Sequence, residues 1–270
     1  MTTTTYPIPS PSGTDLVDLR VTETGSGHPV LLLHGGAGPA SVAGFATLLA
    51  DAFPTRVVVP THPGFDGTDR PADLTSPADL AALYVTLLDH LGLVDVTVVG
   101  NSLGGWVAAE IALAHSPRVS SVVLVDAVGL TSDSEPIVDF FALTMDEIVD
   151  LNYHASHREA ARAAQQALPD AVREAMAGNR SALLAYGGES MADPGLAGRL
   201  PSVAVPTLVV WGAADRIVAP GHGRAYADSI PGATLRIIDD AGHLPQIETP
   251  DALAATIWEF ADRHATARPV

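Results

Sequence analysis

Short runs of Val, Ile and Leu recur along the chain, separated by segments whose apolar residues have helical spacing. The runs are continuous rather than alternating, which is typical of strands buried on both faces of a parallel sheet. They predict strands at Val30–Leu33, Arg56–Pro60, Val96–Val99, Val122–Val125, Thr207–Trp211 and Leu235–Ile238. The segments between them predict helices at Ala40–Ala52, Pro77–Leu91, Gly105–His115, Gly221–Ser229 and Pro250–His264. This order predicts an α/β fold, with a mostly parallel central sheet flanked by helices.

Two segments depart from this rhythm. Leu16–Thr22 alternates between apolar and polar residues, as an antiparallel edge strand would. Residues 131–200 contain no convincing buried strand but do contain helical patches at Ile137–Val149 and Arg158–Ala177. We therefore expect a core domain of residues 1–130 and 201–270, interrupted by a helical cap of residues 131–200. Such a cap would cover the C-terminal edge of the sheet, where ligands bind in open α/β folds.

Composition narrows the possible partners of this 270-residue chain. The net charge is −17, and all 14 basic residues are arginine. This balance argues against nucleic acid or an anionic membrane surface, which both need clustered positive charge. It does not identify a substrate, which we expect from the motifs below to be a small molecule. The chain has no cysteine, no apolar run long enough to span a bilayer and no export signal, so we expect a cytoplasmic protein. No pattern in the sequence specifies an oligomeric state.

The most informative motif is Gly100-Asn101-Ser102-Leu103-Gly104, a G-x-S-x-G sequence between a predicted strand and a predicted helix. A serine on such a tight turn is held in strained backbone, and glycines on either side prevent collisions there. The helix that begins near Leu103 offers free N–H groups and a positive dipole end to a developing oxyanion. Ser102 is therefore the candidate nucleophile.

A second glycine-rich loop, His34-Gly35-Gly36-Ala37-Gly38-Pro39, follows the first predicted parallel strand. It is expected to lie beside the serine turn and to donate a second backbone N–H to the oxyanion. The phosphate-binding pattern G-x-x-x-x-G-K-[ST] does not fit the loop, and the chain has no lysine. The dinucleotide pattern G-x-G-x-x-G fails as well. We expect His34 itself to be a buried structural residue.

A serine hydroxyl needs a base, and the base needs an acid that holds it in the correct tautomer. His243 lies in a loop just after the last predicted strand, at the same edge as Ser102, and is the candidate base. Asp215 follows the strand Thr207–Trp211 and is the candidate acid, because the order Ser, Asp, His is then the expected one. Asp126, at the end of the preceding strand, is the main alternative. His154 and His157 could suggest a metal pair, but a solvated helix face explains them better.

Together these motifs resemble the α/β-hydrolase superfamily over nearly the whole chain. The resemblance implies that the backbone N–H groups of Gly36 and Leu103 form the oxyanion hole and that no metal or organic cofactor is needed. A serine at position 102 disfavours the haloalkane dehalogenase and epoxide hydrolase branches, which use aspartate there. The HGGAGP and GNSLGG sequences are also similar to hydrolases that cleave carbon–carbon bonds in meta-cleavage products. Those enzymes usually carry tryptophan after the catalytic histidine, where this chain has Leu244.

These observations predict a serine hydrolase that acts on a small carboxylic ester or lactone through an acyl-enzyme intermediate. A carbon–carbon hydrolase of the meta-cleavage-product type is the first alternative. A ligand-binding protein that kept the fold and lost catalysis is the second, since a fold does not guarantee a function.

Overall fold

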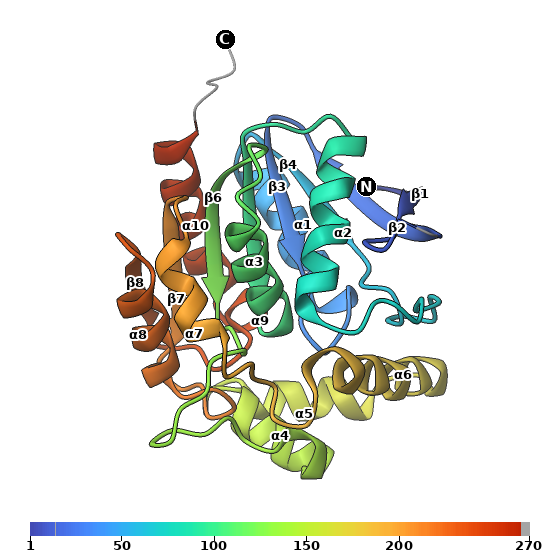
Figure 1. Ribbon diagram of the computed structural model, residues 1–270. Coiled ribbons are helices and arrows are strands. Elements are labelled where there is room, and N and C mark those ends of the chain that lie inside the picture. Colours follow the sequence, from blue (N-terminus) through green and yellow to red (C-terminus); the bar gives the residue numbers. More distant parts are fainter. Residues whose placement is uncertain (14, 266–270) are drawn as a thin grey trace.

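The computed structural model describes residues 1–13 and 15–265, and a single eight-stranded sheet forms its centre (Figure 1). The strands lie in the order β1-β2-β4-β3-β5-β6-β7-β8. Their bounds are Thr2–Pro9 (β1), Leu16–Gly25 (β2), His28–Leu33 (β3), Thr55–Pro60 (β4), Val96–Asn101 (β5), Val119–Val125 (β6), Thr207–Gly212 (β7) and Thr234–Ile238 (β8). Strands β3 to β8 are parallel to their neighbours within that group, and β1 and β2 are antiparallel additions. The predicted α/β fold with a mostly parallel sheet is confirmed.

Each central strand contributes to two separate apolar cores, because successive side chains point to opposite faces of a sheet. In β3, Leu31 and Leu33 face one core, whereas Val30 and Leu32 face the other. The same division holds along β6, where Leu124 lies in the first core and Val125 in the second. Both faces therefore need apolar side chains, which explains why these strands appear as continuous hydrophobic runs in the sequence.

Helices cover both faces of the sheet. On one face, α1 (Ala40–Ala52) packs against β4 and against α10 (Pro250–His264). On the other face lie α2 (Pro77–His90), α3 (Leu103–Leu113) and α8 (Pro220–Ser229). The short α9 (Pro245–Glu248) precedes α10 and contacts α1. The five predicted core helices are therefore present, each displaced by two residues or fewer at its ends.

Two expectations about the sheet edges need correction, and one edge strand was not predicted. Leu16–Thr22 belongs to an antiparallel strand, but not to an edge strand, because β1 pairs with β2 along its outer side. The sequence showed no β1, since four successive threonines and two prolines lack an apolar alternation. At the other edge, β8 is largely exposed, with Ile237 40% exposed, because only β7 borders it.

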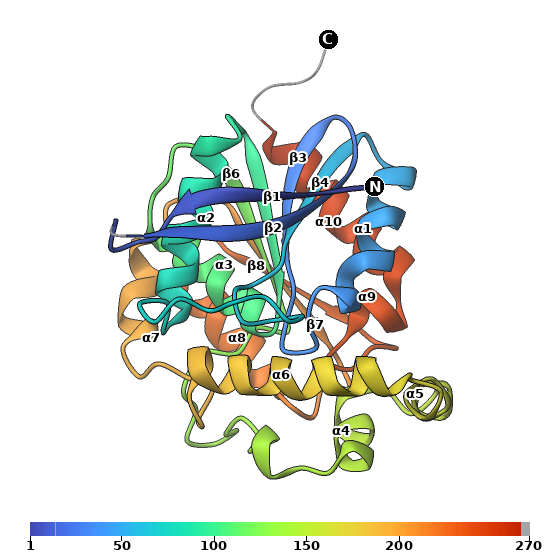
Figure 2. The same ribbon diagram turned by 90° about the vertical axis from the view of Figure 1, so that its right-hand side faces the viewer.

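The segment between β6 and β7 is helical and forms no strand in the described residues (Figure 2). Its elements are η1 (Phe140–Ala142), α4 (Met145–Asn152), α5 (Arg158–Gln166), α6 (Asp170–Gly187), α7 (Leu196–Arg199) and η2 (Leu200–Ser202). In both ribbon views α4, α5 and α6 lie together beyond the C-terminal end of the sheet. The exact domain boundaries at 130 and 200 stay a prediction.

Two helix boundaries in this segment were predicted wrongly. Helix α4 begins at Met145 rather than at Ile137, because Thr144 caps it: its hydroxyl accepts from the N–H of Glu147, whose carboxylate binds back to Thr144. The predicted helix Arg158–Ala177 is two helices, α5 and α6. The break falls at Pro169, which has no N–H to donate and disfavours helical backbone in the residue before it.

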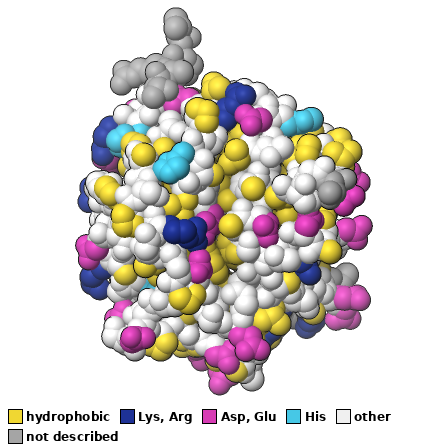
Figure 3. Space-filling model, in the orientation of Figure 1, with side chains coloured by type: hydrophobic (Ala, Val, Ile, Leu, Met, Phe, Trp, Pro, Cys, Tyr) yellow, Lys and Arg dark blue, Asp and Glu magenta, His cyan; other side chains and the backbone are white. Residues whose placement is uncertain are grey.

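The surface agrees with the acidic composition. Asp and Glu side chains are scattered over the face shown in Figure 3, and the arginines drawn there stand apart from one another. Among the described residues, no helix combines the length and the apolar character that crossing a bilayer requires.

Candidate active site

Four side chains named from the sequence follow the C-terminal ends of four neighbouring strands. Ser102 follows β5, Asp126 follows β6, Asp215 follows β7 and His243 follows β8. Because these strands are parallel and adjacent, their C-terminal ends meet at one edge of the sheet. The fold thus brings together residues that are up to 141 positions apart in the chain.

The turn that carries Ser102 is strained and tightly packed. Ser102 has φ 56° and ψ −116°, a conformation that L-residues rarely adopt, and its N–H donates to the carbonyl of Val125 at 2.9 Å. A β-carbon at Gly104 would lie 2.7 Å from the carbonyl oxygen of His34, and one at Gly100 would lie 2.7 Å from the nitrogen of Gly105. Only glycine fits at these two positions, so the two glycines of the motif hold the serine in place.

The glycine loop after β3 lies against this turn. A β-carbon placed on Gly35 would lie 3.0 Å from the β-carbon of Ser102. On its other side the loop meets helix α6, because a β-carbon on Gly36 would lie 2.6 Å from the Leu183 side chain. Leu103 is the first residue of α3, directly after the serine. Gly36 and Leu103, the two residues expected to bind an oxyanion, thus belong to backbone segments that flank Ser102.

Asp215 and His243 form a buried hydrogen-bonded pair. The Nδ1 of His243 lies 2.7 Å from Oδ2 of Asp215, and the two side chains are 7% and 0% exposed. The other oxygen of Asp215 accepts from the N–H groups of Ile217 at 2.8 Å and Val218 at 3.0 Å. An ionised carboxylate with these contacts holds the proton of the imidazole on Nδ1 and leaves Nε2 free to act as a base.

The serine and the histidine loop are joined through Asn101. Its Nδ2 donates to the carbonyl of His243 at 3.1 Å, and its Oδ1 accepts from Gln246 at 3.1 Å. Among the described residues, Ser102 Oγ makes no hydrogen bond with the imidazole. Such bonds are often long without substrate and tighten when substrate binds. The structure therefore pairs the acid with the histidine and places the histidine loop against the serine turn.

Glu248 is a second supporting residue that the sequence analysis missed. Its Oε1 accepts from the N–H groups on either side of His243, at 2.9 Å from Gly242 and 3.3 Å from Leu244. Its Oε2 accepts from the N–H of His154 at 2.7 Å. One buried carboxylate thus ties the histidine loop to the helical segment. An acidic residue five positions after the candidate histidine was the only sign of this role in the sequence. Spacing alone could not show that its carboxylate binds the backbone on both sides of His243.

Asp126 is buried beside the pair rather than bonded to the histidine. One ligand atom each from Asp126, Asp215 and His243 lie within 4.8 Å of one another. The 2.7 Å contact between Asp215 and His243 is a hydrogen-bond length, whereas two ligands of one tetrahedral zinc lie roughly 3.3 Å apart. The cluster therefore fits a hydrogen-bonded arrangement better than a metal site. His154 and His157 belong to no such three-ligand cluster among the described residues.

His34 and His62 are buried, neutral and structural, as expected for His34. The Nδ1 of His34 donates to the carbonyl of Gly35, and its Nε2 accepts from the N–H of His62 at 3.0 Å. The Nε2 of His62 donates to the carbonyl of His34 at 2.8 Å, and its Nδ1 accepts from the hydroxyl of Tyr84. Burial lowers the pKa of His34 well below its usual value and that of His62 to about 4. This network anchors the glycine loop from behind.

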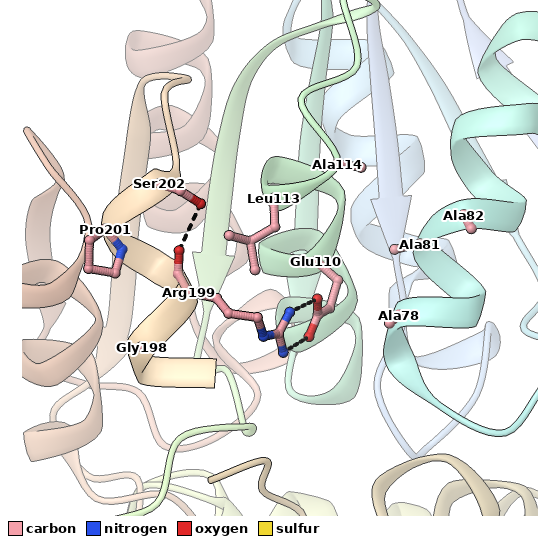
Figure 4. A pocket seen from close by; sticks show the side chains of 10 residues that line it. All are labelled: Ala78, Ala81, Ala82, Glu110, Leu113, Ala114, Gly198, Arg199, Pro201 and Ser202. Carbon is pink, nitrogen blue, oxygen red and sulfur yellow. Dashed lines mark hydrogen bonds and ion pairs between the residues drawn. The ribbon is translucent and has the colours of Figure 1, made fainter. Parts of the chain in front are cut away.

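A surface hollow lies elsewhere, between α2, α3 and η2 (Figure 4). It measures about 780 Å³ and is crossed by Arg199, which donates to both carboxylate oxygens of Glu110 at 2.5 and 2.8 Å. Neither Ser102 nor His243 lines it. The hollow offers no nucleophile with a neighbouring base, because the hydroxyl of Ser202 donates to the carbonyl of Arg199. The candidate active site is therefore the strand edge and not this hollow.

Comparisons with known proteins agree with the geometry. The chain is 30% identical over 266 residues to a 2-hydroxymuconate semialdehyde hydrolase of Pseudomonas putida, with 88% of each chain covered. Among solved structures it resembles a thermophilic esterase from Thermogutta terrifontis (TM-score 0.80, 25% identity, 97% of this chain and 100% of that one). It also resembles Est816, described as an N-acyl homoserine lactone degrading enzyme (TM-score 0.74, 26% identity, 94% and 100% covered). A family model for the alpha/beta hydrolase family matches residues 30–256. This protein therefore belongs to the alpha/beta hydrolase family.

Proposed function

We propose that this protein is a serine hydrolase that cleaves a small carboxylic ester or lactone through an acyl-enzyme. The observation that carries the proposal is the buried 2.7 Å bond between Asp215 and His243, in a loop held against the turn of Ser102. A neutral imidazole with its proton on Nδ1 is a base, and a serine at a strained strand-to-helix turn is the nucleophile it serves.

The proposed reaction has two acyl-transfer steps. His243 takes the proton of Ser102 as the hydroxyl oxygen attacks the substrate carbonyl, and Asp215 stabilises the imidazolium. The backbone N–H groups of Leu103 and Gly36 hold the oxyanion. The leaving alcohol then takes the proton from His243, and water repeats the sequence to release the acid and free Ser102. Losing one oxyanion donor in such sites costs roughly 3–4 kcal/mol.

The helical segment is proposed to act as the cap that selects the substrate. Helix α6 contacts the glycine loop through Leu183, and Asn179 binds the carbonyl of Ala37 at 3.3 Å and the N–H of Asp66 at 2.7 Å. These contacts support a role of α6 as the part of the cap next to the glycine loop. Residues of this helix are therefore positioned to touch the part of the substrate next to the scissile bond.

Two observations favour an ester or lactone over a carbon–carbon bond. Leu244 stands where meta-cleavage-product hydrolases usually carry tryptophan. Those enzymes also need a cation for the substrate carboxylate, yet the five arginines between β6 and β7 already contact protein oxygens. They pair with Tyr153 (Arg158), Asp150 (Arg162), Leu168 (Arg173), Phe140 and Phe141 (Arg180), and Glu110 (Arg199). A free lactone or simple ester makes no such demand.

The carbon–carbon hydrolase remains the second candidate, because a relative with 30% identity has the name 2-hydroxymuconate semialdehyde hydrolase. The two functions are separated by parallel assays on short p-nitrophenyl esters, simple lactones and a yellow dienoate substrate. We expect the esters or lactones to be turned over with the higher kcat/KM. A higher kcat/KM on the dienoate would assign the second function instead.

A variant series tests the serine mechanism itself. Ser102→Ala should lower kcat by a factor on the order of 10⁴ or more while the thermal unfolding curve is retained. Ser202→Ala, on the surface, is the matched control and should keep full activity. A fluorophosphonate probe should label the protein at Ser102. A protein that is unlabelled and inactive on all three substrate classes would instead be the non-catalytic binding protein.

A further inference from the structure

Asp126 is a buried carboxyl group for which the proposed reaction has no task. Its side chain is 0% exposed, at the end of β6, and its φ is 45°. Its Oδ1 accepts from the N–H of Gly212 at 2.8 Å. Its Oδ2 is buried and has no hydrogen-bond partner among the described residues. A carboxylate with an unpaired buried oxygen is costly, whereas a protonated carboxyl can donate from that oxygen.

The acceptor within reach is the carboxylate of Asp215. One oxygen of each carboxyl and a ring nitrogen of His243 lie within 4.8 Å of one another. Asp215 receives two backbone N–H groups and the imidazole, whereas Asp126 receives one N–H. The environment of Asp215 thus favours the charged form more strongly. Two adjacent buried carboxyls do not both ionise, so the charge belongs on Asp215 and the proton on Asp126.

The electrostatics of the site point the same way. Burial raises the pKa of Asp126 well above its usual range, and the neighbouring charge of Asp215 raises it further. Glu248, on α9, adds a smaller effect of the same sign. The N–H of Gly212 opposes these effects without cancelling them.

We propose that Asp126 is a protonated positioning residue that donates its O–H to Asp215, and that it is a reserve acid for His243. By reserve acid we mean a carboxyl that ionises and stabilises the imidazolium when Asp215 cannot. The proposal rests on the serine hydrolase mechanism above. In the wild type the two carboxyls share one proton and one negative charge, and this count is unchanged while His243 accepts the proton of Ser102.

Replacing Asp215 by asparagine removes the neighbouring negative charge, the second of the two effects that keep Asp126 protonated, and leaves burial, the larger one. The positive charge that forms on His243 when it takes the proton of Ser102 then favours the ionised form of Asp126, which releases its proton to solvent and restores a negative charge within 4.8 Å of the imidazolium. The direct bond to Nδ1 is lost, so activity falls, but part of the stabilisation of the imidazolium is kept. The residual activity of Asp215→Asn should therefore depend on Asp126.

A double-mutant cycle tests this dependence. The variants are Asp126→Asn, Asp215→Asn and the double variant, with Asp240→Asn in the exposed loop before His243 as the control. Asparagine tolerates positive φ, so the backbone at position 126 is preserved, which circular dichroism and thermal unfolding verify. We expect Asp126→Asn to lower kcat/KM at least tenfold more in the Asp215→Asn background than in the wild type. An equal effect in both backgrounds would overturn the reserve role.

Infrared spectroscopy gives a readout that needs no substrate. At pH 7 the wild type and Asp240→Asn should show the C=O stretch of a protonated carboxyl. The band should be absent from Asp126→Asn and should remain in Asp215→Asn, where burial keeps Asp126 protonated while His243 is neutral. A wild type without the band, or a band that persists in Asp126→Asn, would refute the proposal. Because this result does not depend on turnover, it distinguishes failure of the protonated state proposed for Asp126 from failure of the proposed function.

Discussion

Acidification should destabilise the fold through His62, in the network behind the glycine loop. The ring is 0% exposed, and both of its nitrogens already have partners, the carbonyl of His34 and the hydroxyl of Tyr84. A second ring proton would displace the tyrosine hydrogen from Nδ1 and create a buried charge. Burial accordingly lowers the pKa of His62 to about 4.

The sign and size of the effect follow from linkage between proton binding and folding. The unfolded chain binds the proton of His62 near pH 6.5, whereas the folded chain does so only near pH 4. This contribution is fully present above pH 6.5 and is lost progressively as the pH falls from 6.5 to 4. The complete displacement of the pKa corresponds to roughly 3 kcal/mol, of which about 2 kcal/mol falls between pH 6.5 and 4.5.

Urea unfolding of the wild type, His62→Asn and His115→Asn between pH 7.5 and 4.5 measures the effect. His115 is exposed, so its variant controls for the loss of a histidine as such. His62→Asn should be less stable at pH 7.5 but should lose about 2 kcal/mol less than the wild type between pH 6.5 and 4.5. His115→Asn should follow the wild type. If the curves of the wild type and His62→Asn run parallel, with less than about 0.5 kcal/mol between their changes, the reasoning is wrong.

Three further substitutions test the architecture of the site. Gly104→Ala places a methyl group against the backbone of β3 and should lower the free energy of unfolding, measured by urea titration, by about 1–3 kcal/mol or more. Its control Gly178→Ala, at a helix position with open space around it, should raise the free energy of unfolding by about 0.5–1 kcal/mol. Asn101→Ala leaves the carbonyl of His243 and the amide of Gln246 without their buried partner and should lower the free energy of unfolding by about 1–3 kcal/mol. It should lower kcat more than it changes KM, and an unchanged kcat would contradict the role of Asn101 in holding the histidine loop. Glu248→Gln should lower the free energy of unfolding by about 1.5–3 kcal/mol, because three backbone N–H groups lose a charged acceptor. The exposed Glu259→Gln should change it by less than about 0.5 kcal/mol, and equal effects of the two variants would contradict the supporting role of Glu248.

Local patterns were sufficient for the core of the fold. The strands β3 to β7 place apolar side chains in both cores, so each contains a short hydrophobic run that can be recognised from the sequence. The serine turn also depends on nearby residues, because side chains at Gly100 and Gly104 would collide with backbone within a few residues of Ser102 and with the end of the adjacent strand β3. The order of these elements along the chain then predicted the edge at which Asp215 and His243 meet.

Patterns failed where neighbours distant in the sequence decide the outcome. Strand β1 has no apolar signature, because its residues pair with β2 at the rim of the sheet and bury little surface. The sequence favoured Asp215 over Asp126 by motif order alone, since both residues follow buried strands. The structure separates them by the hydrogen bonds that each receives, which come from Gly212 in one case and from Ile217, Val218 and His243 in the other.

The amino-acid sequence alone therefore determined the strands β3 to β8, the residue that stands on the strained turn and the loops that carry its partners. Each of these depends on the side-chain periodicity or backbone sterics of a few consecutive residues. Only the tertiary structure decided the pairing of acid with histidine, the roles of Asn101 and Glu248, and the course of α5 and α6. These depend on distances between segments that are far apart in the chain, and packing of the whole molecule sets those distances.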